Sequence, residues 1–261
     1  MQTINSVKGA YIKELLNKGT RVGRGMYDYR SINIEQGMIP HAEGSAQVDL
    51  GYTKVLAGVK IDIDEPMPDK PDEGNLVMSA ELLPLASADY DVGPPSPEAI
   101  ELARVVDRGI RAANVIDTKS LFISEGKVWS VFIDIYILNY DGNLFDASTL
   151  AAVAALSNTR MPKYEDEKVI REGNLGKLKI SSLVTSCTYA KIGNNLILDP
   201  NGEEESIMDA RLTIANDEGY IRAMQKGLSG AFTQQEIEKL IDETFEKSKD
   251  LRAAINKLKT D

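Results

Sequence analysis

The alternation of apolar and polar side chains predicts several strands in the first half of the chain. Residues 44–64 alternate with period two, which is typical of a β-hairpin, and Gly51 marks its turn. An apolar run at 74–86 predicts a further strand, and 120–138 a second hairpin. The second strand of that hairpin, 128–138, is apolar at almost every position. We therefore expect it to be central in a sheet and covered on both faces.

The most regular helical pattern runs from Ser96 to Ala113. Ser96 suits the N-cap and Pro97 the first helical position. Small or apolar side chains recur at spacings of four and three along one face: Ala99, Ala103, Val106, Ile110 and Ala113. Residues 145–158 form an alanine-rich pattern with almost no charge, which predicts a helix buried on all sides.

The two ends of the chain also carry helical patterns. Near the N-terminus the pattern predicts a short amphipathic helix, whose apolar side holds Val7, Tyr11 and Leu15, with Ile12 as a further candidate. This segment lacks the long apolar core of a secretory signal. At the other end, Thr233 and Glu236 form a capping box before a long apolar stripe.

The order of these elements predicts an α+β architecture of two similar lobes, each a small mixed sheet with helices laid against it. The polar stretch 159–175 separates the halves, and strands begin again after it. We accordingly divide the chain into an N-terminal helix and arm (1–30), a first lobe (31–165) and a C-terminal lobe (166–261).

The composition of the chain excludes several kinds of binding and metal site. The net charge of −10 argues against autonomous nucleic-acid binding, although it leaves room for a local basic stripe. With only Cys187 and His41, the chain has neither a disulfide nor a Cys/His zinc site, and we expect His41 to be solvated in a loop rather than a general base. The acidic, proline-rich stretch 62–74 lacks the ligand order of a calcium loop. No apolar run is long enough to cross a bilayer, and we expect a cytoplasmic protein without membrane association.

Arginines stand out in this acidic chain. Arg104, Arg108 and Arg111 share the polar face of the 96–113 helix, where they either bind an anionic partner or pair within the helix, as Asp107–Arg111 and Glu101–Arg104. A second group occupies the arm at 20–30: Arg21, Arg24 and Arg30. For that arm the residues favour a solvated linker over a segment draped on the fold.

Several long motifs, in one order, resemble the RNase PH family. They read GSAQVDLGYTKVLAGVKIDID, EGNLVMSAELLPLA, GPPSPEAIELARVVDRGIR and LDPNGEEESIMDARLTIA. More closely, the chain resembles the non-catalytic RNase PH-like subunits of archaeal exosomes, from about residue 20 to the final helix. The resemblance implies an RNase PH-like fold (ribosomal protein S5 domain 2-like) and a six-membered ring. It also implies an alternating catalytic sister subunit, RNA-binding cap subunits, and RNA degraded from its 3′ end by phosphate attack.

Compared with catalytic members, this chain departs from the family pattern where phosphate should bind. The phosphate loop corresponds to Asp146-Ala147-Ser148-Thr149, where alanine replaces glycine and no arginine follows. Asp146 would repel phosphate if it faced the pocket. The stretch before Ile100 also lacks the arginine of active members.

An acidic cluster occupies the region of the family's catalytic aspartate. It contains Glu203, Glu204, Glu205 and Asp209. We interpret Asp209 as a strand-start or interface residue, with a catalytic or metal role as the alternative.

The resemblance therefore implies a non-catalytic subunit with no cofactor and no metal, in which Arg104 and Arg108 contact RNA phosphates beside the sister subunit's active site. Arg111 is assigned to its helical pair. Two alternatives stay open: a phosphorolytic 3′-to-5′ exoribonuclease active in its own right, and an α+β interaction module without an RNA role.

Overall fold

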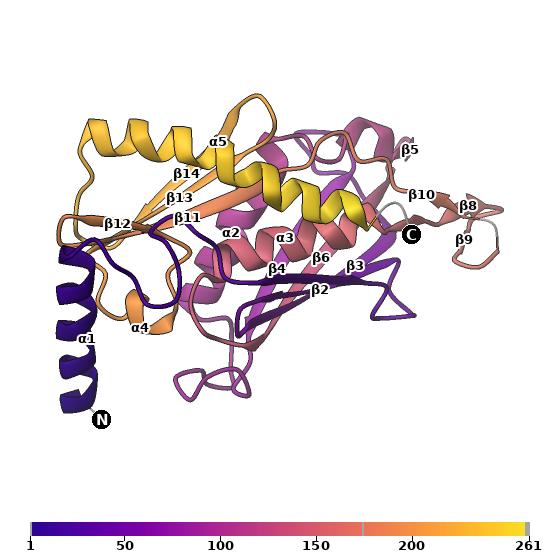
Figure 1. Cartoon of the computed structure of the whole chain (residues 1–261). Coiled ribbons are helices and arrows are strands. Elements are labelled where there is room, and N and C mark those ends of the chain that lie inside the picture. The colour runs from indigo at the N-terminus through magenta and orange to yellow at the C-terminus, as the bar shows by residue number, and fades with distance from the viewer. Residues whose placement is uncertain (1, 174, 259–261) are drawn as a thin grey trace.

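The computed structural model describes residues 2–173 and 175–258, which contain two main sheets (Figure 1). The first has the strand order β1-β2-β3-β6-β4, with the short β5 paired to β6. Neighbours are antiparallel except β4 and β6, which are parallel. Its strands are β1 (Ile32–Gln36), β2 (Gly44–Leu50), β3 (Thr53–Asp64), β4 (Asn75–Leu82), β5 (Phe122–Ser124) and β6 (Lys127–Asn139).

The second sheet is antiparallel, in the order β12-β11-β13-β14. Its strands are β11 (Thr185–Ile192), β12 (Asn195–Leu198), β13 (Ala210–Asn216) and β14 (Ile221–Gly227). Between the sheets the chain forms two short ribbons, β7–β10 and β8–β9. They comprise β7 (Arg160–Met161), β8 (Lys163–Glu165), β9 (Lys168–Ile170) and β10 (Gly176–Lys177).

The helices connect and cover these sheets. They are α1 (Gln2–Asn17), α2 (Pro97–Ala112), the 3₁₀ helix η1 (Thr118–Leu121), α3 (Leu144–Ser157), α4 (Gly202–Glu205) and α5 (Gln234–Lys257). Ser96 caps α2, and Thr233 and Glu236 form the predicted capping box of α5. Among the described residues, no helix is both long and apolar enough to span a bilayer.

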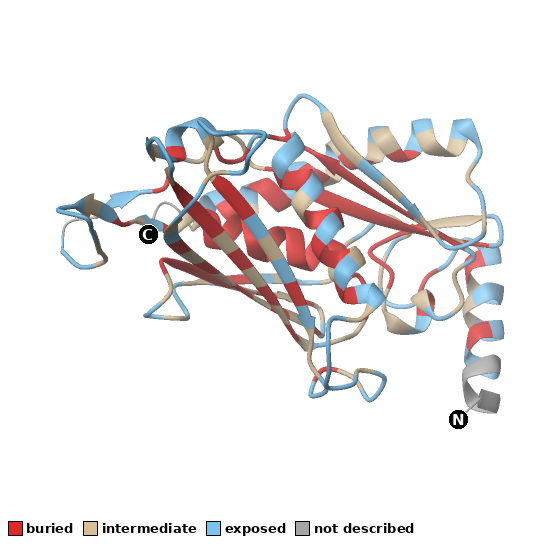
Figure 2. Ribbon diagram, turned by 180° about the vertical axis from the view of Figure 1, so that it is seen from behind, coloured by how far each residue is buried: buried red, intermediate tan, exposed pale blue. Residues whose placement is uncertain are grey.

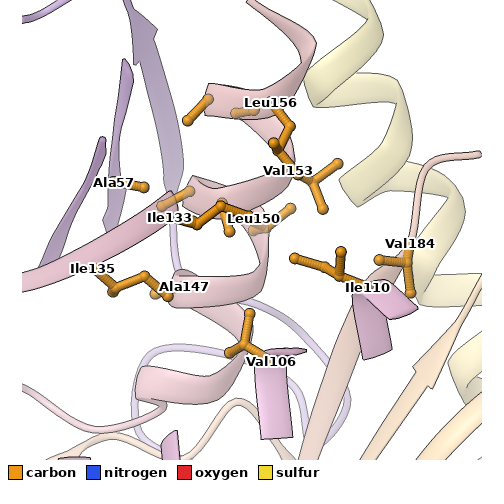
Figure 3. Packing of buried hydrophobic residues seen from close by; sticks show 14 of the residues in the cluster. Ala57, Val106, Ile110, Ile133, Ile135, Ala147, Leu150, Val153, Leu156 and Val184 are labelled. Carbon is orange, nitrogen blue, oxygen red and sulfur yellow. The ribbon is translucent and has the colours of Figure 1, made fainter. Parts of the chain in front are cut away.

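Helix α3 lies at the centre of the fold. Every residue from Phe145 to Leu156 is buried, as the uncharged sequence pattern predicts. One side packs on β2 and β3 of the first sheet, and another on β11 of the second. Figure 3 shows Leu150 near Ile133 of the first sheet and Ile110 of α2 beside Val184, which directly precedes β11 of the second sheet. One continuous hydrophobic core therefore joins the two sheets, and the division into lobes at residue 165 stays a proposal.

The predicted hairpins and the buried face of α2 are confirmed. Strand β6 is central, but only one of its faces is fully covered: Phe132, Asp134 and Tyr136 are half-buried. Along the strands of this sheet, buried residues alternate with more exposed ones, as Figure 2 shows from behind. The expectation that β6 is covered on both faces is therefore wrong, because α3 packs on one side of the sheet only.

The predicted apolar face of α1 is correct only in part, since Ile12 packs against the small core cluster that contains Leu16. Val7 and Tyr11 are exposed, whereas Gly9 and Leu16 are buried. A Cβ at Gly9 would lie 2.8 Å from the Ile207 side chain, so the helix needs glycine to approach that residue. Contact with the segment after α4 therefore decides which side of α1 is buried.

Candidate functional site

The three arginines of α2 are all exposed, but their partners differ. Both carboxylate oxygens of Asp107 accept hydrogen bonds of 2.8 Å from Arg111 Nε, and Arg111 also donates to the Leu76 carbonyl. Arg108 makes a single 3.1 Å hydrogen bond to the neutral Gln225 side chain. Within the described residues, Arg104 has no hydrogen bond or ion pair. Two uncompensated guanidinium groups therefore face solvent.

The alternative that these arginines form ion pairs within the helix is therefore correct for Arg111 and wrong for Arg104. Glu101 does not pair with Arg104. It accepts a 2.6 Å hydrogen bond from Arg211 of β13 instead, and the Arg211 guanidinium stacks 4.1 Å from the Phe145 ring centroid.

An open groove of about 940 Å³ runs between α2 and β4. All three arginines line its helix side. The opposite side is formed by β4 and by Met67, which lies in the loop between β3 and β4. The charged row therefore borders a groove rather than a flat surface.

The stretch expected to correspond to the family's phosphate loop lies within the first two turns of α3. Asp146, Ala147, Ser148 and Thr149 are all buried. The Asp146 carboxylate accepts hydrogen bonds from Tyr29 Oη (2.9 Å), Asn143 Nδ2 (2.9 Å), and the backbone N (2.9 Å) and Oγ1 (2.8 Å) of Thr188. Burial raises the pKa of Asp146 to about 6, although the hydrogen bonds from Asn143 and Thr188 favour the charged form. Asp146 therefore faces the interior and does not repel phosphate from an open pocket.

A different carboxylate occupies the start of α3. Glu205 Oε1 accepts a 2.8 Å hydrogen bond from the backbone N of Asn143, and Oε2 accepts one of 2.6 Å from Tyr140 Oη. A helix N-terminus attracts anions because its first N–H groups lack intrahelical partners. Burial raises the pKa of Glu205, while these two hydrogen bonds and the charge of Arg211 oppose the rise. The chain thus supplies its own anion here.

The pocket beside this helix start has a volume of about 120 Å³. Glu98, Glu101 and Glu205 line it, with Arg211 as its cation. Since Arg211 already pairs with Glu101, this pocket presents an excess of negative charge to an incoming phosphate.

Asp209 lies immediately before β13 and is exposed. Its carboxylate accepts a 2.7 Å hydrogen bond from the backbone N of Gly193, and its own backbone N donates to Lys191 of β11. Asp146 binds Thr188, which precedes Lys191 by three residues in β11. The two anchoring positions on this strand are therefore roughly 10 Å apart. The structure does not bring the two carboxylates together, and no group of three potential metal ligands occurs among the described side chains.

The arm is not a solvated linker. The Arg21 side chain is 1% exposed and binds Glu204 through two hydrogen bonds of 2.7 Å. It also donates to the carbonyls of Leu198 (2.7 Å) and Asp199 (2.9 Å). Burial alone would raise the pKa of Glu204, but the hydrogen bonds and charge of Arg21 hold it below its usual value. The linker interpretation is therefore wrong.

Asp199 is the main residue that sequence reasoning missed. Its buried carboxylate binds Arg24 (2.5 Å) and Arg30 (2.8 Å) of the arm, and Asn143 Nδ2 at the start of α3 (2.7 Å). The available signal was the combination of three clustered arginines with the acidic segment 199–205 in one chain. Glu203 differs from its neighbours in making an exposed ion pair with Lys8. His41 is exposed in its loop, as expected.

Both parts of this fold match models of one family of RNA-degrading proteins. The chain belongs to the 3′ exoribonuclease family: domain 1 matches residues 28–162 and domain 2 matches residues 182–247.

Within that family it is similar to exosome components named Rrp42. The Thermococcus gammatolerans protein is 48% identical over 92% of this chain and 91% of its own length. The Methanothermobacter thermautotrophicus protein is 44% identical over 100% and 98%. Among solved structures, an Archaeoglobus fulgidus exosome with RNA bound to the active site contains a chain with 42% identity and a TM-score of 0.91, covering 96% of this chain and 98% of that one.

Proposed function

We propose that this chain is a non-catalytic subunit of an archaeal exosome. It completes a ring with a catalytic RNase PH-family subunit and supports 3′-to-5′ phosphorolytic RNA degradation there. The observation that carries the non-catalytic assignment is the Glu205 carboxylate at the start of α3. The similarity to Rrp42 proteins and to an exosome with bound RNA supports the assembly.

Phosphorolysis requires inorganic phosphate to be held in line with the last phosphodiester, beside groups that stabilise the developing charge. Here Glu205 takes the hydrogen-bond donor at the helix start, and Glu98 and Glu101 add further negative charge. Asp209 is anchored at Lys191 of β11, about 10 Å along that strand from Thr188, which binds Asp146. These residues disfavour the alternative of an exoribonuclease active by itself, so the chemistry falls to the sister subunit.

RNA binding falls to Arg104 and Arg108. Guanidinium groups bind phosphate oxygens through paired hydrogen bonds, and no carboxylate in the described part of the chain pairs with either of these two. Arg111 is already paired with Asp107 and contributes less. Their position in the groove also disfavours an interaction module without an RNA role.

The finer assembly follows from the family resemblance. Three copies alternate with three catalytic subunits, cap subunits with RNA-binding domains lie on one face, and the complex is cytoplasmic. The chain needs no cofactor or metal of its own for this role.

The test is the double variant R104A/R108A in the reconstituted complex. Each lost contact to single-stranded RNA should reduce the slope of log K against log salt by about 0.7, so the pair should reduce it by about 1.4. The matched control is R111A, which should change the slope little because Asp107 already compensates Arg111. An unchanged slope for R104A/R108A in an intact ring would contradict the assignment.

A further inference from the structure

Helix α2 comes close to the second sheet beside Arg108. The next residue, Gly109, is buried, and a Cβ at that position would lie 3.3 Å from the Ala215 side chain of β13. On the neighbouring strand β14, the Oε1 atom of Gln225 accepts a 3.1 Å hydrogen bond from Arg108 Nη2. The absence of a side chain at Gly109 thus lets the first-lobe helix approach until Arg108 reaches an acceptor on the other sheet.

Arg108 also lies at a boundary between two surfaces. It lines the groove between α2 and β4, together with Arg104 and Arg111. Arg108 alone of these three also lines a small cavity between α2 and the second sheet, which Gln225 lines as well. The hydrogen bond from Gln225 therefore acts on an arginine of the groove from outside the groove.

The three arginines of α2 differ in how their charge is compensated. Asp107 pairs with Arg111 and cancels its charge, whereas Arg104 has no partner among the described residues. Gln225 provides a third arrangement, because its amide oxygen is neutral and leaves the full positive charge on Arg108. An exposed arginine without such an acceptor samples many rotamers, so a ligand must order it on binding.

We propose that Gln225 is a positioning residue for RNA binding, which orients the Arg108 guanidinium for a phosphate in the groove without neutralising it. This inference rests on the proposed function, because it concerns how Arg108 is prepared for the phosphate that it binds. Gln225 acts through Arg108, so the second lobe contributes to RNA binding through a contact with the helix of the first.

The neutrality of the acceptor is the property that matters. A glutamate at position 225 would have nearly the same size and would accept the same hydrogen bond. It would also form an ion pair with Arg108 that an incoming phosphate must displace. An apolar side chain would leave the charge of Arg108 intact but would not orient its guanidinium. An amide therefore orients this cation and leaves it available to an anion.

The experiment measures the affinity of the reconstituted complex for single-stranded RNA over a range of salt concentrations. Q225M removes the acceptor at similar volume, so affinity should fall roughly two- to tenfold, as expected for ordering one long side chain, while the salt slope stays unchanged. Q225E should instead reduce the slope by up to about 0.7, toward the slope of R108A, because it neutralises one phosphate-binding charge. In phosphorolysis assays both variants should raise KM for RNA and leave kcat unchanged, since the sister subunit performs the chemistry.

Matched controls separate positioning from a general effect of these substitutions. Gln235 is exposed in the first turn of α5 and lies outside the groove, so Q235M and Q235E should keep the wild-type affinity and slope. The double variant R108A/Q225M tests the coupling between the two residues. If Gln225 acts through Arg108, this variant should bind RNA as R108A does.

Three results would overturn the inference: wild-type affinity in Q225M, a wild-type slope in Q225E, or weaker binding by R108A/Q225M than by R108A. Loss of ring assembly in both Gln225 variants would overturn it as well, because Gln225 would then be an interface residue. The single variant R108A distinguishes this inference from the proposed function. If R108A weakens RNA binding while both Gln225 variants bind normally, only the positioning role fails; if R108A also binds normally, the proposed RNA role of Arg108 fails.

Discussion

Replacing Arg21 by alanine tests how the N-terminal arm is fixed to the fold. The guanidinium is 1% exposed and the Glu204 side chain 7% exposed, so the variant leaves a buried carboxylate without its main partner. Breaking a buried ion pair in this way costs about 3–5 kcal/mol. Arg24 still lies 3.2 Å from Glu204, which places the expected loss near 3 kcal/mol.

The assay is urea denaturation at pH 7, followed by far-UV circular dichroism and by the fluorescence of Trp129, the single tryptophan, which is 7% exposed. The control is K18A, whose ion pair with Glu14 is 63% exposed on both sides and should contribute less than about 0.5 kcal/mol. Because Arg21 lowers the pKa of Glu204, the stability from this pair is present above the unfolded pKa of 4.5 and is lost as pH falls through the lower folded value. The cost of R21A should therefore shrink at pH 3. A loss below about 1 kcal/mol at pH 7 would refute the buried-pair reasoning.

Further predictions concern the central helix and the C-terminal helix. G44A should lose about 1–3 kcal/mol, since its Cβ would lie 2.5 Å from the Ala155 carbonyl oxygen; thermal unfolding would show this, and an unchanged Tm would contradict it. Because the folded pKa of Asp146 is about 6 against 3.8, wild-type stability relative to D146N should fall by about 2 kcal/mol as pH rises from 4 to 7, and parallel pH profiles in denaturant titrations would argue against this. T233A should lose about 1 kcal/mol by removing the cap that Glu236 completes, whereas T233S should retain most of it.

Sequence patterns predicted elements well where the deciding interactions are local. The face of α2 follows from the spacing of Ala99, Val106 and Ile110, and all three are buried. The burial of α3 follows from its lack of charge. In both helices, the apolar side chains of the helix itself indicate which surface is buried.

Predictions failed where a residue distant in the sequence determines which side chains are buried. Arg21 is buried because it pairs with Glu204. That partner lies 183 residues away in the sequence, so no local pattern indicates the contact. In α1, Gly9 lies on the buried side although it carries no apolar side chain, so hydrophobic periodicity selected Val7 and Tyr11 instead.

The candidate site shows the same division. The exposed arginine row was predictable from helical periodicity. Spacing alone offered helical partners to both Arg104 and Arg111, and only the family resemblance separated Arg104 and Arg108 from Arg111. The departure from the family's phosphate loop was visible in Ala147 and in the missing arginine, and Asp146 was expected to repel phosphate if it faced the pocket. Only the tertiary structure shows that Asp146 faces the core and that Glu205 occupies the start of α3.

The central claim is that this chain supports RNA degradation without performing it. Its most direct test measures nucleoside diphosphates released from a 3′-labelled single-stranded RNA in the presence of inorganic phosphate, by this chain alone and by the chain reconstituted with a catalytic RNase PH-family subunit. The account predicts no release by the purified chain and phosphate-dependent release by the complex. Phosphate-dependent release by the chain alone would contradict it.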